Sequence, residues 1–283
     1  MPRYKHDVED REGNMNISKR SSTLLVTTML AFAVVTGCSK DSNNNPVDKA
    51  PPTESYMTVK LDGASTQVAF GDCAKIDADG EEAIQLDEFV TTDLIPVFTD
   101  KDETDWDARS LYSYEIISSD GYSASGVKGY PNNIWEHMSL GHLLTSNRLV
   151  FFPDEKIDLA GAYNVKDAVE IIVHRKFDVT APDTVDFFEL SDFTTTRVNN
   201  WDGIEEDAVP LADYVTALVA NPESYMYNLV SLDQYSPPDD LNWEKFQTGY
   251  WLLDSERTIF THAEVTSSKY GVRVLETILV KAP

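Results

Sequence analysis

The chain has 283 residues, of which 42% are hydrophobic and 25% charged, enough apolar material to build a sizeable folded core. Its 23 Lys and Arg stand against 48 Asp and Glu, so the net charge is −25. A field of that sign repels nucleic acid phosphates and anionic headgroups. We therefore exclude nucleic acid binding and expect a basic protein or a small ligand as partner.

The first 37 residues have the pattern of a secretory signal peptide. Lys19 and Arg20 precede an uncharged stretch, residues 21–37, whose apolar core is shorter than the roughly 20 residues that a membrane-spanning helix needs. Residues 1–14 carry four acidic side chains, which is unusual ahead of such a stretch. We therefore predict that translation starts at Met15.

Residues 35–38 (VTGC) resemble the lipobox of bacterial lipoproteins. The resemblance implies that Cys38 is lipidated, becomes the mature N-terminus and anchors the protein stably in a membrane. Residues 38–55 are rich in Ser, Asn, Asp and Pro and are expected to form a flexible tether. Ser39 and Lys40 favour the outer membrane, facing the periplasm or the surface. A cleaved signal peptide followed by a chance cysteine is the alternative.

Once Cys38 carries lipid, Cys73 is the only thiol left, so no intramolecular disulfide can form. A lone buried cysteine usually behaves as a small hydrophobic residue, and as a thiolate it can also bind a metal. Both interpretations stay open at this point.

Residues 75–89 place Asp77, Asp79 and Gly80 at positions 3, 5 and 6 of a calcium-binding loop. The pattern fails because Lys75 and Leu86 occupy positions 1 and 12, so the Asp-Gly pair predicts a turn instead.

A second acidic segment, residues 99–110, contains Asp100 and Asp102 as candidate ligands for a divalent cation; a solvated acidic loop is the alternative. The histidines after the tether have no metal-binding spacing, so we expect them at the surface or partly buried: His137, His142, His174 and His262.

Several blocks of sequence occur twice in the same order. Residues 112–122 (YSYEIISSDGY) match residues 225–235 (YMYNLVSLDQY). Flanking blocks repeat as well, among them AIQLDEFVT with AVPLADYVT, and VKDAVEIIV with VRVLETILV. Blocks that repeat in order predict a duplicated structural unit. We call residues 56–177 the first half and residues 178–283 the second half.

Each half combines strand and helix patterns. Short runs rich in β-branched and aromatic residues predict strands: YEIIS, RLVFF and AVEIIV in the first half, NLVSL and ETILV in the second. LDEFVTTDLI and LADYVTALVA have helical spacing and predict one short helix per half. The segments that begin near Trp135 and Trp243 fit a helical turn or a covering loop. The predicted class is α+β, with more strand than helix.

Each half resembles a molybdopterin-binding domain of the sulfite-oxidase type. The blocks that carry the resemblance are IQLDEFV, EIISSDGY, NRLVFFPD and VKDAVEIIV in the first half, with weaker matches in the second. In that family a cysteine upstream of the first block binds the metal, a role that only Cys73 could fill here. The sequence lacks the family's Cys-x-Gly context and its Arg and His cluster for the pterin phosphate.

These observations favour a lipid-anchored, non-catalytic binding or accessory module without a cofactor. Its ligand site would lie between the halves or beside the two Asp turns at Asp120 and Asp233. One alternative is a molybdopterin-dependent oxidoreductase with Cys73 as the metal ligand. Another is a lipoprotein that binds a divalent cation through Asp100 and Asp102.

Overall fold

The computed structural model describes residues 55–61, 63–95, 97–153, 155–265 and 267–283, and residues 50–283 belong to one compact unit. The expected signal peptide, Cys38 and the tether before Ser55 lie outside the described residues. Among the described residues, none of the helices has the length and apolar character needed to cross a membrane.

The largest sheet in the described residues has nine strands, and its main path runs β16-β15-β19-β11-β1-β2. β12 pairs with β11, and β7 pairs with β11 and β8. The strands are β1 (Tyr56–Leu61), β2 (Ala64–Ala69), β7 (Tyr112–Ser118), β8 (Asn133–Ile134), β11 (Ala168–Ala181), β12 (Thr184–Glu189), β15 (Met226–Ser231), β16 (Leu241–Asn242) and β19 (Leu275–Lys281).

Two smaller sheets have four strands each, in the orders β10-β9-β4-β3 and β13-β14-β17-β18. A two-stranded hairpin, β5-β6, accompanies them. The strands are β3 (Ile76–Ala78), β4 (Glu81–Gln85), β5 (Phe98–Thr99), β6 (Asp105–Trp106), β9 (His142–Leu144), β10 (Val150–Phe151), β13 (Thr196–Asn199), β14 (Glu205–Pro210), β17 (Gly249–Leu252) and β18 (Arg257–Phe260). Strands dominate, which confirms the α+β class with more strand than helix.

The helices are short. They are η1 (Leu86–Phe89), η2 (Ala108–Leu111), η3 (Ala124–Lys128), α1 (Trp135–Met138), η4 (Gly161–Tyr163), η5 (Leu190–Asp192), α2 (Leu211–Leu218), η6 (Pro222–Ser224), α3 (Trp243–Phe246) and α4 (Ser267–Tyr270). The helix predicted in the second half is α2. Its first-half counterpart, η1, is a single 3-10 turn. The β-branched run Val90, Thr91 and Thr92 follows η1, and such residues disfavour the continuation of a helix.

The same strand pairings occur in each half. β4 pairs with β9 and β9 with β10, as β14 pairs with β17 and β17 with β18. β7 runs antiparallel to β11, as β15 does to β19. A tyrosine at the start of each of these two strands donates a hydrogen bond to a backbone carbonyl five residues earlier: Tyr114 to Arg109 at 2.8 Å, and Tyr227 to Pro222.

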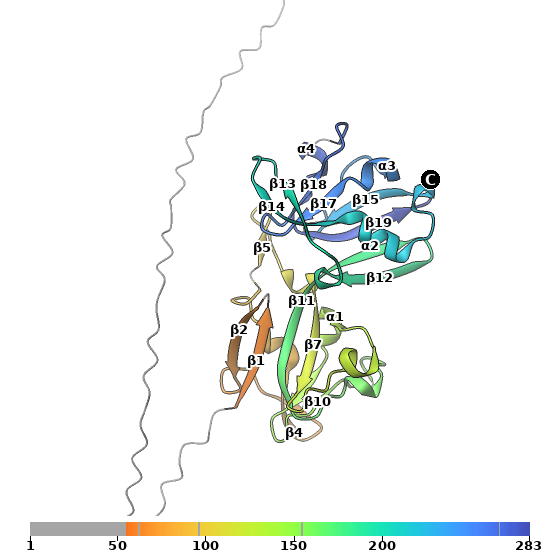
Figure 1. The fold of residues 1–283 in the computed structure, drawn as a ribbon. Helices are drawn as coiled ribbons and strands as arrows, with labels where there is room; N and C mark the ends of the chain where they lie inside the picture. Colours follow the sequence, from red (N-terminus) through yellow and green to blue (C-terminus); the bar gives the residue numbers. More distant parts are fainter. Residues whose placement is uncertain (1–54, 62, 96, 154, 266) are drawn as a thin grey trace, which may run out of the picture. The chain divides into compact units, whose positions relative to one another are not determined.

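Strand β11 belongs to both halves. Its N-terminal part pairs with β7 and lies parallel to β1, whereas its C-terminal part pairs with β12 and lies parallel to β19. Figure 1 shows β11 continuing from the part that contains β1 and β7 to the part that contains β12. The strand predicted at residues 168–173 is present but extends to Ala181. The boundary between the halves, after residue 177, therefore falls inside a strand.

Two large apolar clusters fill the body. One contains Met57, Phe89 and Ile171, all fully buried. The other is aromatic: the Phe177 ring lies 5.2 Å from both Tyr214 and Trp251, centroid to centroid. Edge-to-face packing at such distances adds to the stabilisation that comes from burying apolar area.

Arg175 is a buried cation at the middle of β11. Its guanidinium donates to the carbonyl of Leu111 at 3.1 Å, to the carbonyl of Leu275 at 2.5 Å, and to the carbonyl of Lys176. It also lies 4.7 Å from the Phe177 ring and 5.6 Å from the Trp251 ring. Because Leu111 is in the first half and Leu275 in the second, this one side chain ties the halves together.

Candidate functional site

A pocket of about 390 Å³ opens where the two halves meet; we call it the junction pocket. The first half contributes His137, Tyr163 and Lys176, and the second half contributes Asp178, Phe187 and Glu276. The two residues from β11, Lys176 and Asp178, are two apart and therefore face the same side of the strand. Because β11 belongs to both halves, side chains of both halves lie on one wall of the pocket.

The charges of the junction pocket are mostly negative. Lys176 is 5% exposed, and its Nζ lies 2.6 Å from Asp178 Oδ1 and 5.8 Å from the centre of the Phe187 ring. Burial, together with the nearby Asp178 carboxylate, raises the pKa of Glu276, while Lys176 acts in the opposite direction. Glu136 and Asp186 line the pocket as well. Since Asp178 already neutralises the one lysine, the remaining carboxylates favour a positively charged ligand.

His137 adds an uncharged polar group. Burial lowers the pKa of this imidazole, and the adjacent Glu136 only partly opposes the shift. The ring is therefore neutral at pH 7 and can either donate or accept a hydrogen bond.

A polar network adjoins the junction pocket. The His174 ring lies between two carboxylates, with Nε2 3.8 Å from Glu115 Oε2 and Nδ1 3.7 Å from Glu189 Oε2. Glu115 Oε1 accepts from Ser123 Oγ at 2.6 Å, and Glu189 Oε1 accepts from Asn132 Nδ2 at 2.8 Å. Asn132 also lines the junction pocket, so this network borders the same cavity.

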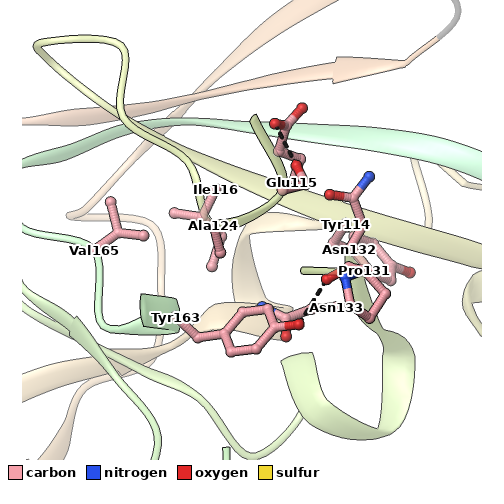
Figure 2. Close-up of a pocket in the computed structure, with 10 residues that line it drawn as sticks. Tyr114, Glu115, Ile116, Ala124, Pro131, Asn132, Asn133, Tyr163 and Val165 are labelled. Carbon is pink, nitrogen blue, oxygen red and sulfur yellow. Dashed lines mark hydrogen bonds between the residues drawn. The ribbon is translucent and has the colours of Figure 1, made fainter. Parts of the chain in front are cut away.

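Figure 2 shows a second, much smaller cavity beside this network, lined by Glu115, Asn132, Asn133 and Tyr163. Its volume is about 10 Å³, which is room for roughly one water molecule. Tyr163 closes one side and donates from its hydroxyl to the carbonyl of Pro131 at 2.7 Å. A space of this size is too small for an organic ligand.

Cys73 lies in the apolar cluster with Met57 and Phe89 and is only 7% exposed. Its Sγ is 3.6 Å from the carbonyl of Ala69, and burial raises the pKa of the thiol against the opposing effect of Lys75. Cys73 lines none of the pockets that we describe in residues 55–283. A buried thiol held in its protonated form does not fit the metal ligand of a molybdopterin site.

We expect Cys73 to react slowly with a thiol reagent in the folded protein. In the Cys38→Ser variant, Cys73 is the only cysteine. Iodoacetamide should modify it at least about tenfold more slowly in buffer than in urea, because burial shields the thiol from the reagent and raises its pKa, and only the thiolate reacts. Mass spectrometry of timed samples measures the two rates. Equal rates would show that the thiol is accessible, and would reopen its role as a ligand.

Asp100 organises the β5-β6 turn. Its Oδ1 accepts from the backbone N–H groups of Asp102 at 2.8 Å and Thr104 at 3.0 Å, and its Oδ2 accepts from Trp106 Nε1 at 2.9 Å. These hydrogen bonds lower the pKa of Asp100. Both oxygens are thus engaged in holding a loop. Across the described residues, no group of three or more His, Cys, Asp or Glu side chains is placed to hold a metal ion.

Asp120 and Asp233 have the same role in two equivalent turns. Asp120 Oδ1 accepts from Ser118 Oγ and from the backbone N–H of Tyr122 at 3.1 Å, and these bonds lower its pKa. Asp233 Oδ1 accepts from Ser231 Oγ and from the N–H of Tyr235 at 3.3 Å. Asp120 also lines a pocket of about 250 Å³, whereas Asp233 lines neither this pocket nor the junction pocket.

The residues that line the junction pocket were not predicted individually, although a site between the halves was. Lys176 and Asp178 belong to the polar run HRKFD, which follows an apolar strand in the sequence and does not look like its continuation. No protein-family model, curated protein or solved structure matches this chain.

Proposed function

We propose that this chain is an exported lipoprotein, anchored through Cys38 in the outer membrane, whose body is a non-catalytic binding module. The body consists of two tandem units related to the sulfite-oxidase-type molybdopterin-binding domain. Its ligand site is the junction pocket, and the ligand is a basic peptide segment or a small basic molecule.

Pairing registers support the tandem arrangement. β1 pairs with β2 from Tyr56↔Ala69 to Leu61↔Ala64, and β11 pairs with β12 from Lys176↔Glu189 to Ala181↔Thr184. The second hairpin lies 120 residues after the first at every position of this register. In this scheme the last strand of the first unit continues directly into the first strand of the second unit.

The shape and charge of the junction pocket support the binding role. About 390 Å³ is within the range of pockets that take small ligands or a few side chains. The three carboxylates of Glu136, Asp186 and Glu276 outnumber the one lysine of the pocket, Lys176, and this lysine already forms an ion pair with Asp178. The aromatic face of Phe187 can pack against the apolar stem of a basic side chain.

The test compares two peptides and two matched variants. We expect the tripeptide Lys-Phe-Lys to bind the wild-type protein, and Glu-Phe-Glu not to bind, in calorimetric titrations at low ionic strength. Val185, 69% exposed, lines the junction pocket, whereas Val127, 60% exposed, does not. Val185→Trp should weaken binding by about tenfold or more by filling the pocket, and Val127→Trp should leave it unchanged.

Two outcomes would reject the proposal. Equal affinity for both peptides would show that the charge of the ligand does not matter. Equal effects of the two tryptophan variants would show that the ligand does not bind in the junction pocket.

The membrane anchor is tested separately. Cys38→Ser should move the protein from the membrane fraction to the soluble fraction, and retention of the variant in membranes would contradict lipidation.

A further inference from the structure

Strand β19 contains a β-bulge, in which Glu276 is one residue too many for the pairing with β15. Val230 pairs with Thr277 and Ser231 pairs with Leu275, so Glu276 has no residue opposite it. A bulge re-aims side chains and is frequent next to binding sites. The side chain of Glu276 lines the junction pocket. The bulge is therefore part of the wall of the proposed ligand site.

The first half has the same bulge with a different side chain. In the β7-β11 pairing the register shifts at Val169, which is the extra residue there. The repeated blocks align Val169 with Glu276. The residue two positions before the extra one has positive φ in both halves, 51° at Asp167 and 48° at Val274. The backbone of the bulge is thus common to both halves, and the carboxylate belongs to the second half alone.

A glutamine in the turn after β15 holds this carboxylate. Gln234 Nε2 donates a hydrogen bond to Glu276 Oε2 at 3.3 Å. Gln234 has a φ of 62°, in the left-handed region that favours glycine, and the matching residue of the first half is a glycine, Gly121, with a φ of 83°. The second half therefore has a residue that suits its backbone less well, and the side chain of that residue orients Glu276.

Glu276 differs from the other carboxylates of the junction pocket. It is partly buried and has no ion pair among the described residues. Asp178 pairs with Lys176, whereas Glu136 and Asp186 are exposed. Because water and salt screen a partly buried charge less than an exposed one, Glu276 should attract a cation more strongly than Glu136 or Asp186 does.

We propose that Glu276 is the residue that selects a cationic ligand in the junction pocket, that Gln234 is its positioning residue, and that acid releases the ligand by protonating Glu276. This inference rests on the proposed function, since it names the group that recognises the charge of the ligand and the condition that ends binding.

The charges around Glu276 give the direction of the pH dependence. Burial raises the pKa of Glu276 above its ordinary value of 4.5, Asp178 raises it further, and Lys176, Gln234 and Arg175 oppose the shift. The negative charge is therefore lost at a higher pH than in an exposed glutamate. The other ionisable groups of the pocket come from α1 and β12: Glu136, His137 and Asp186. Protonation of any of them also makes the pocket more positive, so binding of a cation should weaken as the pH falls.

The experiment is a calorimetric titration with Lys-Phe-Lys at pH 7 and pH 5. Glu276→Gln should weaken binding at pH 7 by about tenfold, the effect of losing one charge-assisted contact. The further loss of affinity at pH 5 should be smaller in Glu276→Gln than in the wild-type protein, because the variant has no carboxylate to protonate at this position.

Glu136→Gln is the matched control. It makes the same chemical change at an exposed carboxylate of the same pocket. Because solvent screens this charge, binding at pH 7 should stay within about threefold of the wild-type affinity, and the loss at pH 5 should be that of the wild-type protein.

Gln234→Gly tests the positioning role by placing the residue of the first half in the turn. Glycine suits the left-handed backbone, so the melting temperature should stay close to the wild-type value. Without the hydrogen bond from Gln234, which favours the charged carboxylate, the pKa of Glu276 should rise further. Affinity should therefore be lost at a higher pH than in the wild-type protein, a shift that a purely structural role of Gln234 would not produce.

The outcomes separate this inference from the proposed function. If Lys-Phe-Lys does not bind the wild-type protein, both are overturned. If it binds, but Glu276→Gln and Glu136→Gln weaken binding equally, the junction pocket stands as the ligand site and selection by Glu276 is rejected. An equal loss of affinity between pH 7 and pH 5 in Glu276→Gln and the wild-type protein rejects release by protonation of Glu276.

Discussion

Replacing Arg175 by methionine should lower the free energy of unfolding by about 3 kcal/mol, because buried carbonyls lose their donors and each unsatisfied group costs about 1–3 kcal/mol. The affected carbonyls are those of Leu111, Lys176 and Leu275. Loss of the contacts with the Phe177 and Trp251 rings adds to the effect. Removing a buried charge offsets part of it. The midpoint of urea denaturation measures the change.

Arg197 provides the control for Arg175. It is an exposed arginine that pairs with Asp207 at 3.1 Å on the β13-β14 hairpin. Because exposed ion pairs contribute little, Arg197→Met should leave the midpoint of urea denaturation close to the wild-type value. Equal midpoints of urea denaturation for Arg175→Met and Arg197→Met would contradict the conclusion that the hydrogen bonds of Arg175 stabilise the contact between the halves.

Gly141→Ala and Gly249→Ala should each destabilise the protein by about 1–3 kcal/mol through overpacking. A Cβ on Gly141 would lie 2.5 Å from Leu86 Cδ1 and 2.6 Å from Phe152 Cε1. A Cβ on Gly249 would lie 2.5 Å from Phe260 Cε1. These neighbours are buried and cannot move aside freely. Thermal unfolding of the two single variants measures the effect.

Gly161→Ala is the matched substitution in open space. Gly161 opens η4, has no atom within 4 Å of the added Cβ and does not have a positive φ. The unfolding free energy of the Gly161→Ala variant should stay within about 0.5 kcal/mol of the wild-type value. A destabilisation by Gly161→Ala as large as that of Gly141→Ala would show that the close contacts at Gly141 are not the cause.

Local patterns predicted the strands well. The runs YEIIS, AVEIIV and ETILV lie in strands, because short runs of β-branched and aromatic residues suit the buried strands of a central sheet. NLVSL is a strand as far as Ser231, and of RLVFF only Val150 and Phe151 form a strand. Residues 174–178 (HRKFD) were not expected to be strand. Their polar side chains are accommodated by specific partners, such as Asp178 for Lys176 and backbone carbonyls for Arg175. The carbonyls of Leu111 and Leu275 belong to distant segments, so the partners of Arg175 cannot be read from the local sequence.

The site could be predicted only in outline. A ligand site between the halves was predicted; a pocket lies there, the junction pocket, and its role as the ligand site is our proposal. Asp120 and Asp233 were correctly placed in turns, but their carboxylates serve the turns themselves. His142 was expected at the surface or partly buried, and it is buried because β9 is the second strand from the edge of its sheet and packs against Phe151.

The sharing of β11 has a mechanical consequence. Many proteins with two halves close on a ligand by bending a few linker residues. Here the connection is a hydrogen-bonded strand with partners on each part of its length, so a bend between the halves would have to break the sheet. The junction pocket is therefore preformed. In the proposed binding role, selectivity comes from this fixed shape and charge, and binding should cost little conformational entropy.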